Sequence, residues 1–241
     1  MVHCHLMTEK ALRPPLIQSA KSEAYFKGLK EARPSSGYRP AQQLRSATSE
    51  RKLLESAEKL FAEHGYLGTK VADIIKHSGC STGSFYHRFS DKEGLARVLV
   101  ERYYETTKDG IEAFDMSKSE HGSLRGLLTR IAEFSYATST SRLGVYRAAQ
   151  RLAQTSPEVW HNPNTLTRLA SDRAIAVLGE YADEIHAADP AAAMQKSVQL
   201  IILVILQTKL GAGNLFPTEH GELVELVVNA SLGILKLENE K

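Results

Sequence analysis

Residues 78–93, SGCSTGSFYHRFSDKE, hold the densest group of side chains with chemistry to offer. Three aromatic rings and a run of hydroxyl residues follow a glycine, and His87, Arg88 and Lys92 add basic groups. The segment has no obvious catalytic pair and no cluster with metal-ligand spacing. These residue types suit hydrogen bonds to phosphate oxygens and to base edges better than they suit covalent catalysis.

A short helix that begins at Ser81 or Thr82 and ends near Phe89 explains the pattern. On a helical wheel, Phe85 and Phe89 lie four residues apart and face a small core that includes Leu60 and Ile74. The opposite face is small at its start and polar further on, so that the backbone can approach a nucleic-acid groove closely. This face consists of Thr82, Gly83, Ser84, Tyr86 and His87.

Two further helices must position this short one. The apolar spacing predicts a first helix over about 48–64, with a buried face made of Leu53, Leu54, Ala57, Leu60 and Phe61. Gly65 suits the end of that helix, and Thr69 can cap a second helix over about 70–78. Gly79 then permits a tight reversal, and the whole forms a helix-turn-helix arrangement.

Two lysines stand at predicted helix N-termini. Lys70 begins the second helix, and Lys92 lies at the start of a fourth helix over about 91–114, which opens on the capping box Ser90–Glu93. The free amides of a helix start and a positive side chain together attract phosphate. Tyr86 adds a hydroxyl on a rigid ring for the same purpose.

Residues 53–100 are similar, without a gap, to the DNA-binding domain of TetR-family transcriptional regulators. The motifs LFAEHGY, T-x-V-x-D-I and S-G-x-S-x-G-x-x-Y-x-x-F-x-x-K-E-x-L carry the resemblance. It implies an N-terminal helix-turn-helix domain and a C-terminal helical domain that binds an inducer. It also implies a four-helix dimer bundle formed by the last two helices of each subunit.

The resemblance assigns roles to individual residues. Thr82, Gly83 and Ser84 are expected to meet bases or nearby backbone, while Tyr86, His87 and Lys92 hold phosphates, with Lys70 at the start of the second helix. The chain departs from the family pattern in three places. Lys70 stands where Thr or Ser is usual, Cys80 where Val or Ala is common, and Arg88 where His or Tyr is usual.

Helical periodicity continues from about Thr48, and no stretch alternates with period two. We therefore expect an all-α protein with an N-terminal three-helix helix-turn-helix domain over 48–95 and a C-terminal helical ligand-binding and dimerisation domain over 96–241. Residues 1–47 are expected to form a basic, disordered extension. The later helices are predicted over about 122–138, 142–154, 162–186, 190–210 and 221–237.

Residues 200–206, LIILVIL, are apolar on every side of a helix, and a monomer buries only one side against its own core. The last helix adds a second apolar face with small residues. A homodimer interface that includes Leu203, Leu206, Val227 and Leu232 is therefore predicted. The alternative is a central helix that is wholly buried within one chain.

An aromatic and cationic group in the C-terminal half suggests a ligand pocket made of Tyr136, Tyr146, Arg147, Arg151 and Trp160. Arg147 and Arg151 lie four residues apart and could clamp a carboxylate or a phosphate. The alternative is that the arginines form a solvated helix face and the rings belong to the core. We expect a small-molecule effector here, and no cofactor or metal.

The bulk composition is that of a soluble globular protein, with 42% apolar and 24% charged residues. The net charge of +2 does not indicate a binding partner, but residues 1–47 carry eight basic and three acidic side chains. That extension could reach a minor groove or remain solvated. His3, Cys4 and His5 lack a fourth metal ligand. Three features favour a cytoplasmic location: the chain has only two cysteines, Cys4 and Cys80, it shows no signal peptide, and its longest apolar run is too short to cross a membrane.

These observations together predict a homodimeric transcriptional regulator, a ligand-responsive repressor acting on a near-palindromic double-stranded DNA operator. One alternative is a DNA-binding dimer that activates or that needs no ligand. The other is a small all-α enzyme built on Arg147, Arg151 and His161, for which the sequence supplies no nucleophile beside a base.

Overall fold

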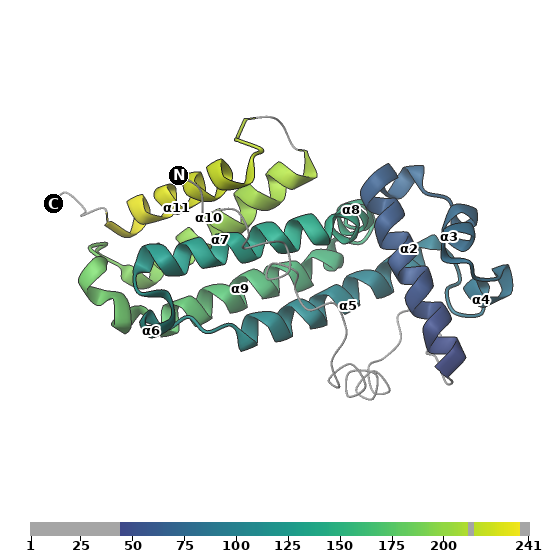
Figure 1. Ribbon diagram of the computed structural model, residues 1–241, viewed down its shortest axis with the longest axis horizontal. Helices are drawn as coiled ribbons and strands as arrows, with labels where there is room; N and C mark the ends of the chain where they lie inside the picture. Colours follow the sequence, from purple (N-terminus) through teal and green to yellow (C-terminus); the bar gives the residue numbers. More distant parts are fainter. Residues whose placement is uncertain (1–43, 212–214, 237–241) are drawn as a thin grey trace, which may run out of the picture.

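The computed structural model describes residues 44–211 and 215–236, including all side chains except those of 44–46 and 160–163. The regular elements within these ranges are all helices, which confirms the all-α expectation (Figure 1). They are α2 (Leu44–Gly68), α3 (Val71–Ser78), α4 (Thr82–Tyr86), α5 (Lys92–Ala113), α6 (Lys118–His121), α7 (Leu124–Ser141), α8 (Leu143–Leu152), α9 (His161–Ala176), α10 (Pro190–Leu210) and α11 (His220–Lys236), with 3₁₀ turns η1 (Pro157–Trp160) and η2 (Leu178–Glu184).

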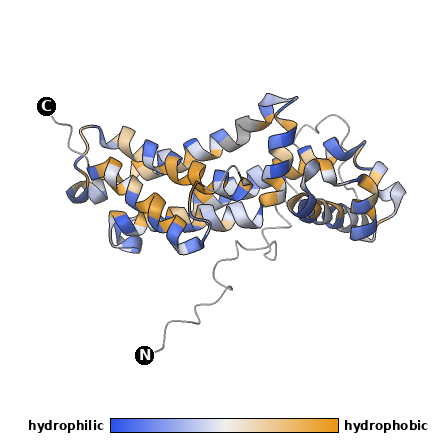
Figure 2. Ribbon diagram, turned by 90° about the horizontal axis from the view of Figure 1, so that it is seen from above, coloured by the Kyte–Doolittle hydropathy of each residue, from blue (hydrophilic) through white to orange (hydrophobic). Residues whose placement is uncertain are grey.

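The molecule is elongated, with α2, α3 and α4 at one end and the other helices extending away from them (Figure 1). The long helix α5 leaves this end and runs beside α9, while α7, α10 and α11 pack alongside. Helix α8 lies at the junction, packed against both α2 and α5. Viewed from the side of α10 and α11, the helices that extend away from α2, α3 and α4 carry many hydrophobic residues (Figure 2).

The glycine turns lie where the sequence predicted them. Gly65 has φ 72° and Gly79 has φ 66°, a conformation that costs glycine little and other residues more. Gly65 interrupts α2, which continues for another turn to Gly68. Gly79 ends α3 in the left-handed conformation and leads directly into α4, where the Ser81 hydroxyl accepts the N–H of Ser84 at 3.1 Å.

Two predicted helix caps are wrong. Thr69 is buried, and its hydroxyl donates to the carbonyls of Leu60 and Gly65, so that it closes the end of α2 and does not cap α3. Helix α5 is capped one residue later than expected, since Asp91 and not Ser90 accepts the N–H of Gly94 at 2.8 Å. In both places, a tertiary contact or a better acceptor displaced the local pattern.

Several predicted boundaries also change. Helix α2 begins at Leu44, so the last part of the predicted extension is helical, and the rest of that extension lies outside the described residues. The single helix predicted over 162–186 is two elements, because α9 ends at Ala176 and the chain turns into η2. The short helix α6 was not expected, and α7 begins at Leu124 with Ser123 as its N-cap.

The junction between the two parts depends on a close helix crossing. A β-carbon on Gly144 of α8 would lie 1.9 Å from the carbonyl oxygen of Glu58 on α2, so only glycine permits this approach. Two arginines reinforce the contact: Arg142 pairs with Glu58 at 3.1 Å, and Arg147 donates to the carbonyl of Ala62. Helix α8 is thereby fixed to the backbone of α2.

Helix α10 is long and strongly apolar. Its length and a mean hydropathy of 1.4 over an 18-residue window would also suit a membrane-crossing helix, but the core helix of a soluble protein meets the same criteria. Here α10 packs against α7, α9 and α11. Its inner face, with Met194, Val198 and Ile201 fully buried, belongs to the core of the helical domain.

Replacing Gly144 with alanine should destabilise the protein, because the new methyl group would overlap the Glu58 carbonyl and force α8 away from α2. We expect a loss of about 2 kcal/mol or more and a melting temperature lower by roughly 5 °C or more. Differential scanning calorimetry measures both. Gly179→Ala is the control, because a β-carbon there would meet nothing within 4 Å. Equal melting temperatures for the two variants would contradict the close crossing.

Candidate nucleic-acid interface and internal cavity

Helix α4 presents the polar surface that the sequence predicted. Phe85 and Phe89 are fully buried, and their rings lie 5.7 Å apart in the core below α4. Tyr86 is 57% exposed, although its ring still contacts the edge of Phe85. We call the outward side of α4 the recognition face; it consists of Thr82, Gly83, Ser84, Tyr86 and His87. Four of these five residues are exposed, and Ser84 is partly exposed.

Lys70 occupies the N-cap position of α3 and is exposed. Its backbone N–H donates to the carboxylate of Asp73 at 3.2 Å, which leaves the lysine side chain to project from the start of the helix. The ammonium group is thus available at a helix N-terminus, where anions are favoured.

Lys92 has a different environment from the one expected. Its ammonium group donates to the carbonyls of Tyr66 and Thr69 at 2.8 and 2.9 Å, and it lies 4.3 Å from the centre of the Tyr66 ring. Burial, and then the charge of Arg151, lower the pKa of Lys92. Two of its three N–H donors therefore link the end of α2 to the start of α5. The third N–H remains for the phosphate contact, which stays a prediction.

A buried charge cluster joins the recognition helix to its neighbours. Glu50 of α2 is 2% exposed, and its carboxylate accepts hydrogen bonds from Arg88, at 3.1 Å, and from Arg102 of α5. Arg88 lies two residues after the end of α4 and is 4% exposed. One carboxylate thus ties α2, the end of α4 and α5 together, and the unusual arginine at position 88 has a structural role inside the domain.

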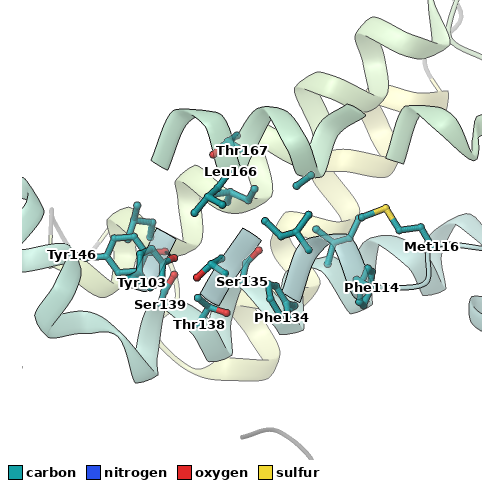
Figure 3. A pocket seen from close by; sticks show the side chains of 16 residues that line it. Tyr103, Phe114, Met116, Phe134, Ser135, Thr138, Ser139, Tyr146, Leu166 and Thr167 are labelled. Atoms are coloured by element: carbon teal, nitrogen blue, oxygen red, sulfur yellow. Dashed lines mark hydrogen bonds between the residues drawn. The ribbon is translucent and has the colours of Figure 1, made fainter. Parts of the chain in front are cut away.

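The helical domain encloses a cavity of about 90 Å³ between α5, α7, α8, α9 and α10 (Figure 3). Aromatic and aliphatic side chains form most of its wall, and hydroxyl groups supply the polar part. The lining consists of Tyr103, Thr107, Ile111, Phe114, Met116, Ile131, Phe134, Ser135, Thr138, Ser139, Tyr146, Leu166, Thr167, Ala170, Ile202 and Leu206.

The two tyrosines mark the polar end of the cavity. The hydroxyls of Tyr103 on α5 and Tyr146 on α8 are hydrogen-bonded to each other, and the rings meet edge to face at 5.3 Å. Burial raises the pKa of Tyr103, and burial together with the neighbouring Tyr103 raises the pKa of Tyr146 well above 10. Both rings are therefore neutral hydrogen-bonding groups. Phe114 and Met116 lie at the other end (Figure 3).

Of the predicted ligand-binding residues, Tyr146 lines this cavity, and three others lie elsewhere. Arg147 donates to the Ala62 carbonyl and Arg151 to Gln154, so the predicted carboxylate clamp is wrong. Tyr136 packs under the ammonium of Lys209 at 3.7 Å and beside His220. The Trp160 side chain lies outside the described residues. Arg147 serves the junction, because α8 packs against α2 as well as lining the cavity, and Arg151 is engaged locally.

The four predicted dimer residues also lie in different environments. Leu203 is 57% exposed, whereas Val227 and Leu232 are 1% and 7% exposed and belong to the core of the subunit. Leu206 lines the cavity. Placing Val227 and Leu232 on an outer face was therefore wrong, because α11 turns that side toward α7 and α10. Leu226, at 38% exposure, lies on the outer side instead.

Residues 53–99, which form α3, α4 and parts of α2 and α5, match the family model described as bacterial regulatory proteins, tetR family. This segment of the chain is similar to the DNA-binding part of tetR-family regulators.

Relatives with established names are similar over the same region. The HTH-type transcriptional repressor ComR of Escherichia coli is 35% identical over 81 residues, which are 33% of this chain and 39% of ComR. The HTH-type transcriptional repressor AcnR of Corynebacterium efficiens is 40% identical over 65 residues, 25% of this chain and 35% of AcnR. The chain thus spans well under half the length of these relatives.

Solved structures extend the tetR fold to the helical domain. A tetR-family regulatory protein from Rhodococcus RHA1 has a TM-score of 0.58 at 16% identity, covering 79% of this chain and 98% of that one. A TetR-family regulator from Mesorhizobium loti has a TM-score of 0.56 at 21% identity, covering 81% and 100%. At these identities the likeness concerns the fold.

Sequence reasoning missed the charge cluster and most of the cavity. Glu50 lies three and four residues before Leu53 and Leu54, so its spacing already placed a carboxylate on the buried face of α2. A similar signal existed in α7, where Ser135, Thr138 and Ser139 continue, at helical spacing, the buried face of Leu128 and Ile131. The partners of both features come from distant segments, and no local pattern could supply them.

Replacing Glu50 with glutamine should destabilise the protein strongly, because it leaves the guanidinium groups of Arg88 and Arg102 without their counter-charge. We expect the free energy of unfolding to fall by about 3 kcal/mol or more in urea denaturation. Glu55→Gln is the matched control on the same helix, since its exposed pair with Arg51 should contribute about 0.5 kcal/mol or less. Losses of similar size in the two variants would refute the central role of Glu50.

Proposed function

We propose that this protein is a transcriptional repressor that binds double-stranded DNA as a homodimer and releases it when a small molecule enters the helical domain. The observation that carries the proposal is the recognition face on α4 within a segment that matches the tetR family. Two buried phenylalanines anchor α4, and its outward side offers small and polar residues for the major groove.

Contacts to the phosphate backbone would flank this face. Tyr86 and His87 are exposed at the end of α4, and Lys70 is exposed at the start of α3. Their positions support phosphate binding on both sides of the inserted helix, which would orient it without reading sequence. Thr82, Gly83 and Ser84 remain the candidates for base contacts.

A second copy of the chain is the proposed cover for the outer side of α10 and α11. Leu203 and Leu226 are 57% and 38% exposed there, and a solvated surface favours polar side chains at such positions. Ala230 and Gly233 are also exposed on α11, and small residues let helices approach closely. A two-fold axis at this face would set the two recognition helices about one turn of DNA apart, ~34 Å, on a near-palindromic site.

Control by an effector is proposed from the position of the cavity. Its wall includes α5, which also carries the Lys92 and Arg102 contacts to the helix-turn-helix domain. A ligand that binds only when these walls separate would favour a state with a different spacing of the two recognition helices. DNA affinity would then fall as ligand binds. Such a regulator acts in the cytoplasm, beside the bacterial chromosome.

Replacing Lys70 with alanine should weaken binding to all duplex sequences alike, because its proposed partner is a phosphate. The slope of log affinity against log salt concentration should become shallower by up to about 0.9. Fluorescence anisotropy with a duplex from the region upstream of the protein's own gene gives the slope. Lys108→Ala is the control, because Lys108 lies on α5 and pairs with Glu112. An unchanged slope for Lys70→Ala would remove this residue from the interface.

Replacing Leu203 with aspartate should separate the dimer, because it places a charge at the centre of the proposed apolar contact. Sedimentation velocity should show a monomer with intact helical circular dichroism, and DNA affinity should fall with dimer loss. Leu67→Asp serves as the comparison, since Leu67 is 72% exposed on α2. A Leu203→Asp protein that sediments as a dimer would place the interface elsewhere.

A further inference from the structure

We propose that the effector of this regulator is a neutral, mainly apolar small molecule with one hydrogen-bonding group, and that this group binds at the Tyr103–Tyr146 hydroxyl pair. The inference rests on the proposed function, since it names the chemical class of ligand that the cavity of the helical domain takes. It replaces the carboxylate or phosphate that the arginine spacing first suggested.

The cavity wall excludes charged ligands. Among the described residues, its lining contains no Asp, Glu, Lys, Arg or His side chain. A carboxylate or an ammonium ion moved into such a wall would lose its hydration without gaining a counter-charge, which costs several kcal/mol. Arg142, Arg147 and Arg151, the cations closest in sequence to Tyr146, are held by Glu58, the Ala62 carbonyl and Gln154.

The polar groups are concentrated and can serve one ligand group. Tyr103 and Tyr146 bond to each other, and hydrogen bonds of Tyr103 with Thr107 and of Tyr146 with Ser139 partly oppose the rise of their pKa. Tyr103, Tyr146 and Ser139 lie at the same end of the cavity, away from Phe114 (Figure 3), and Thr107 also lines it. Hydroxyls can both donate and accept, so a carbonyl or an alcohol of the ligand fits equally.

The size of the cavity links binding to switching. Its volume is about 90 Å³, below the ~150 Å³ of an engineered apolar cavity that holds benzene. A ring or a medium-length alkyl chain therefore fits wholly inside only if the walls move apart. Tyr103 lies on α5 and Tyr146 on α8, so a ligand group that takes one of the hydroxyls breaks a link between these helices. Helix α8 in turn is fixed to α2 at Gly144.

Matched probes test the ligand class directly. Acetophenone and 2-octanone carry one carbonyl on an apolar body, and benzoate and octanoate are similar in shape but negatively charged. Thermal shift and isothermal titration calorimetry on the full-length protein without DNA should show binding of at least one ketone at millimolar concentration. Each carboxylate should bind at least tenfold more weakly than its ketone.

Variants then locate the binding group. Tyr103→Phe should weaken ketone binding by roughly 3- to 10-fold, as expected for one lost hydrogen bond. Tyr104→Phe is the control on the same helix, because Tyr104 does not line the cavity. Ala170→Leu fills the cavity and should abolish ketone binding. If that variant is poorly folded, Ala170→Val, which adds less volume at the same position of the wall, should weaken ketone binding by a smaller factor.

Three results would overturn the inference: no binding of either ketone, carboxylates that bind as tightly as ketones, or equal ketone affinity in the Tyr103→Phe and Tyr104→Phe proteins. Failure of the proposed function looks different. It would appear as no binding of the ligand-free protein to duplex DNA, whether or not the ketones bind. A ketone that binds and also lowers DNA affinity supports both proposals.

Discussion

The close crossing of α8 over α2 is the contact on which the arrangement of the two domains depends. Only a glycine at position 144 allows the helices to approach this far, and Arg142 and Arg147 then fix α8 to Glu58 and to the Ala62 carbonyl. Because α8 also carries Tyr146, the same short helix forms part of the DNA-binding unit's support and part of the cavity wall. A displacement of α8 therefore affects both.

Charged side chains also hold α2 against its neighbours in the DNA-binding end of the molecule. Glu50 holds Arg88 and Arg102, and Lys92 holds the carbonyls that follow the Gly65 turn. Buried charges of this kind stabilise little in total, but each defines a geometry that apolar contacts would leave free. Helix α4 is thus positioned by phenylalanines from below and by Arg88 at its end, while its recognition face stays open.

The comparison of sequence and structure shows where local patterns are reliable. The positions of Phe85, Phe89 and the glycine turns followed from helical spacing and backbone freedom, which are properties of neighbouring residues. Thr69 was misjudged as a helix cap, and the carbonyl contacts of Lys92 were not anticipated, because both side chains donate to backbone carbonyls at the end of α2. The arginine pair of α8 failed as a ligand clamp because both guanidinium groups have partners within the protein.

The sequence by itself determined the helical class, the helix-turn-helix segment and the recognition face, because each depends on residues within a few turns of one another. Only the tertiary structure decided which groups line the cavity and which side of α11 is buried. Five helices contribute to that cavity, and its neutral polar end exists only where Tyr103 and Tyr146 meet across 43 positions of sequence. Contacts between distant segments depend on how helices cross, and the crossing is set by packing rather than by local pattern.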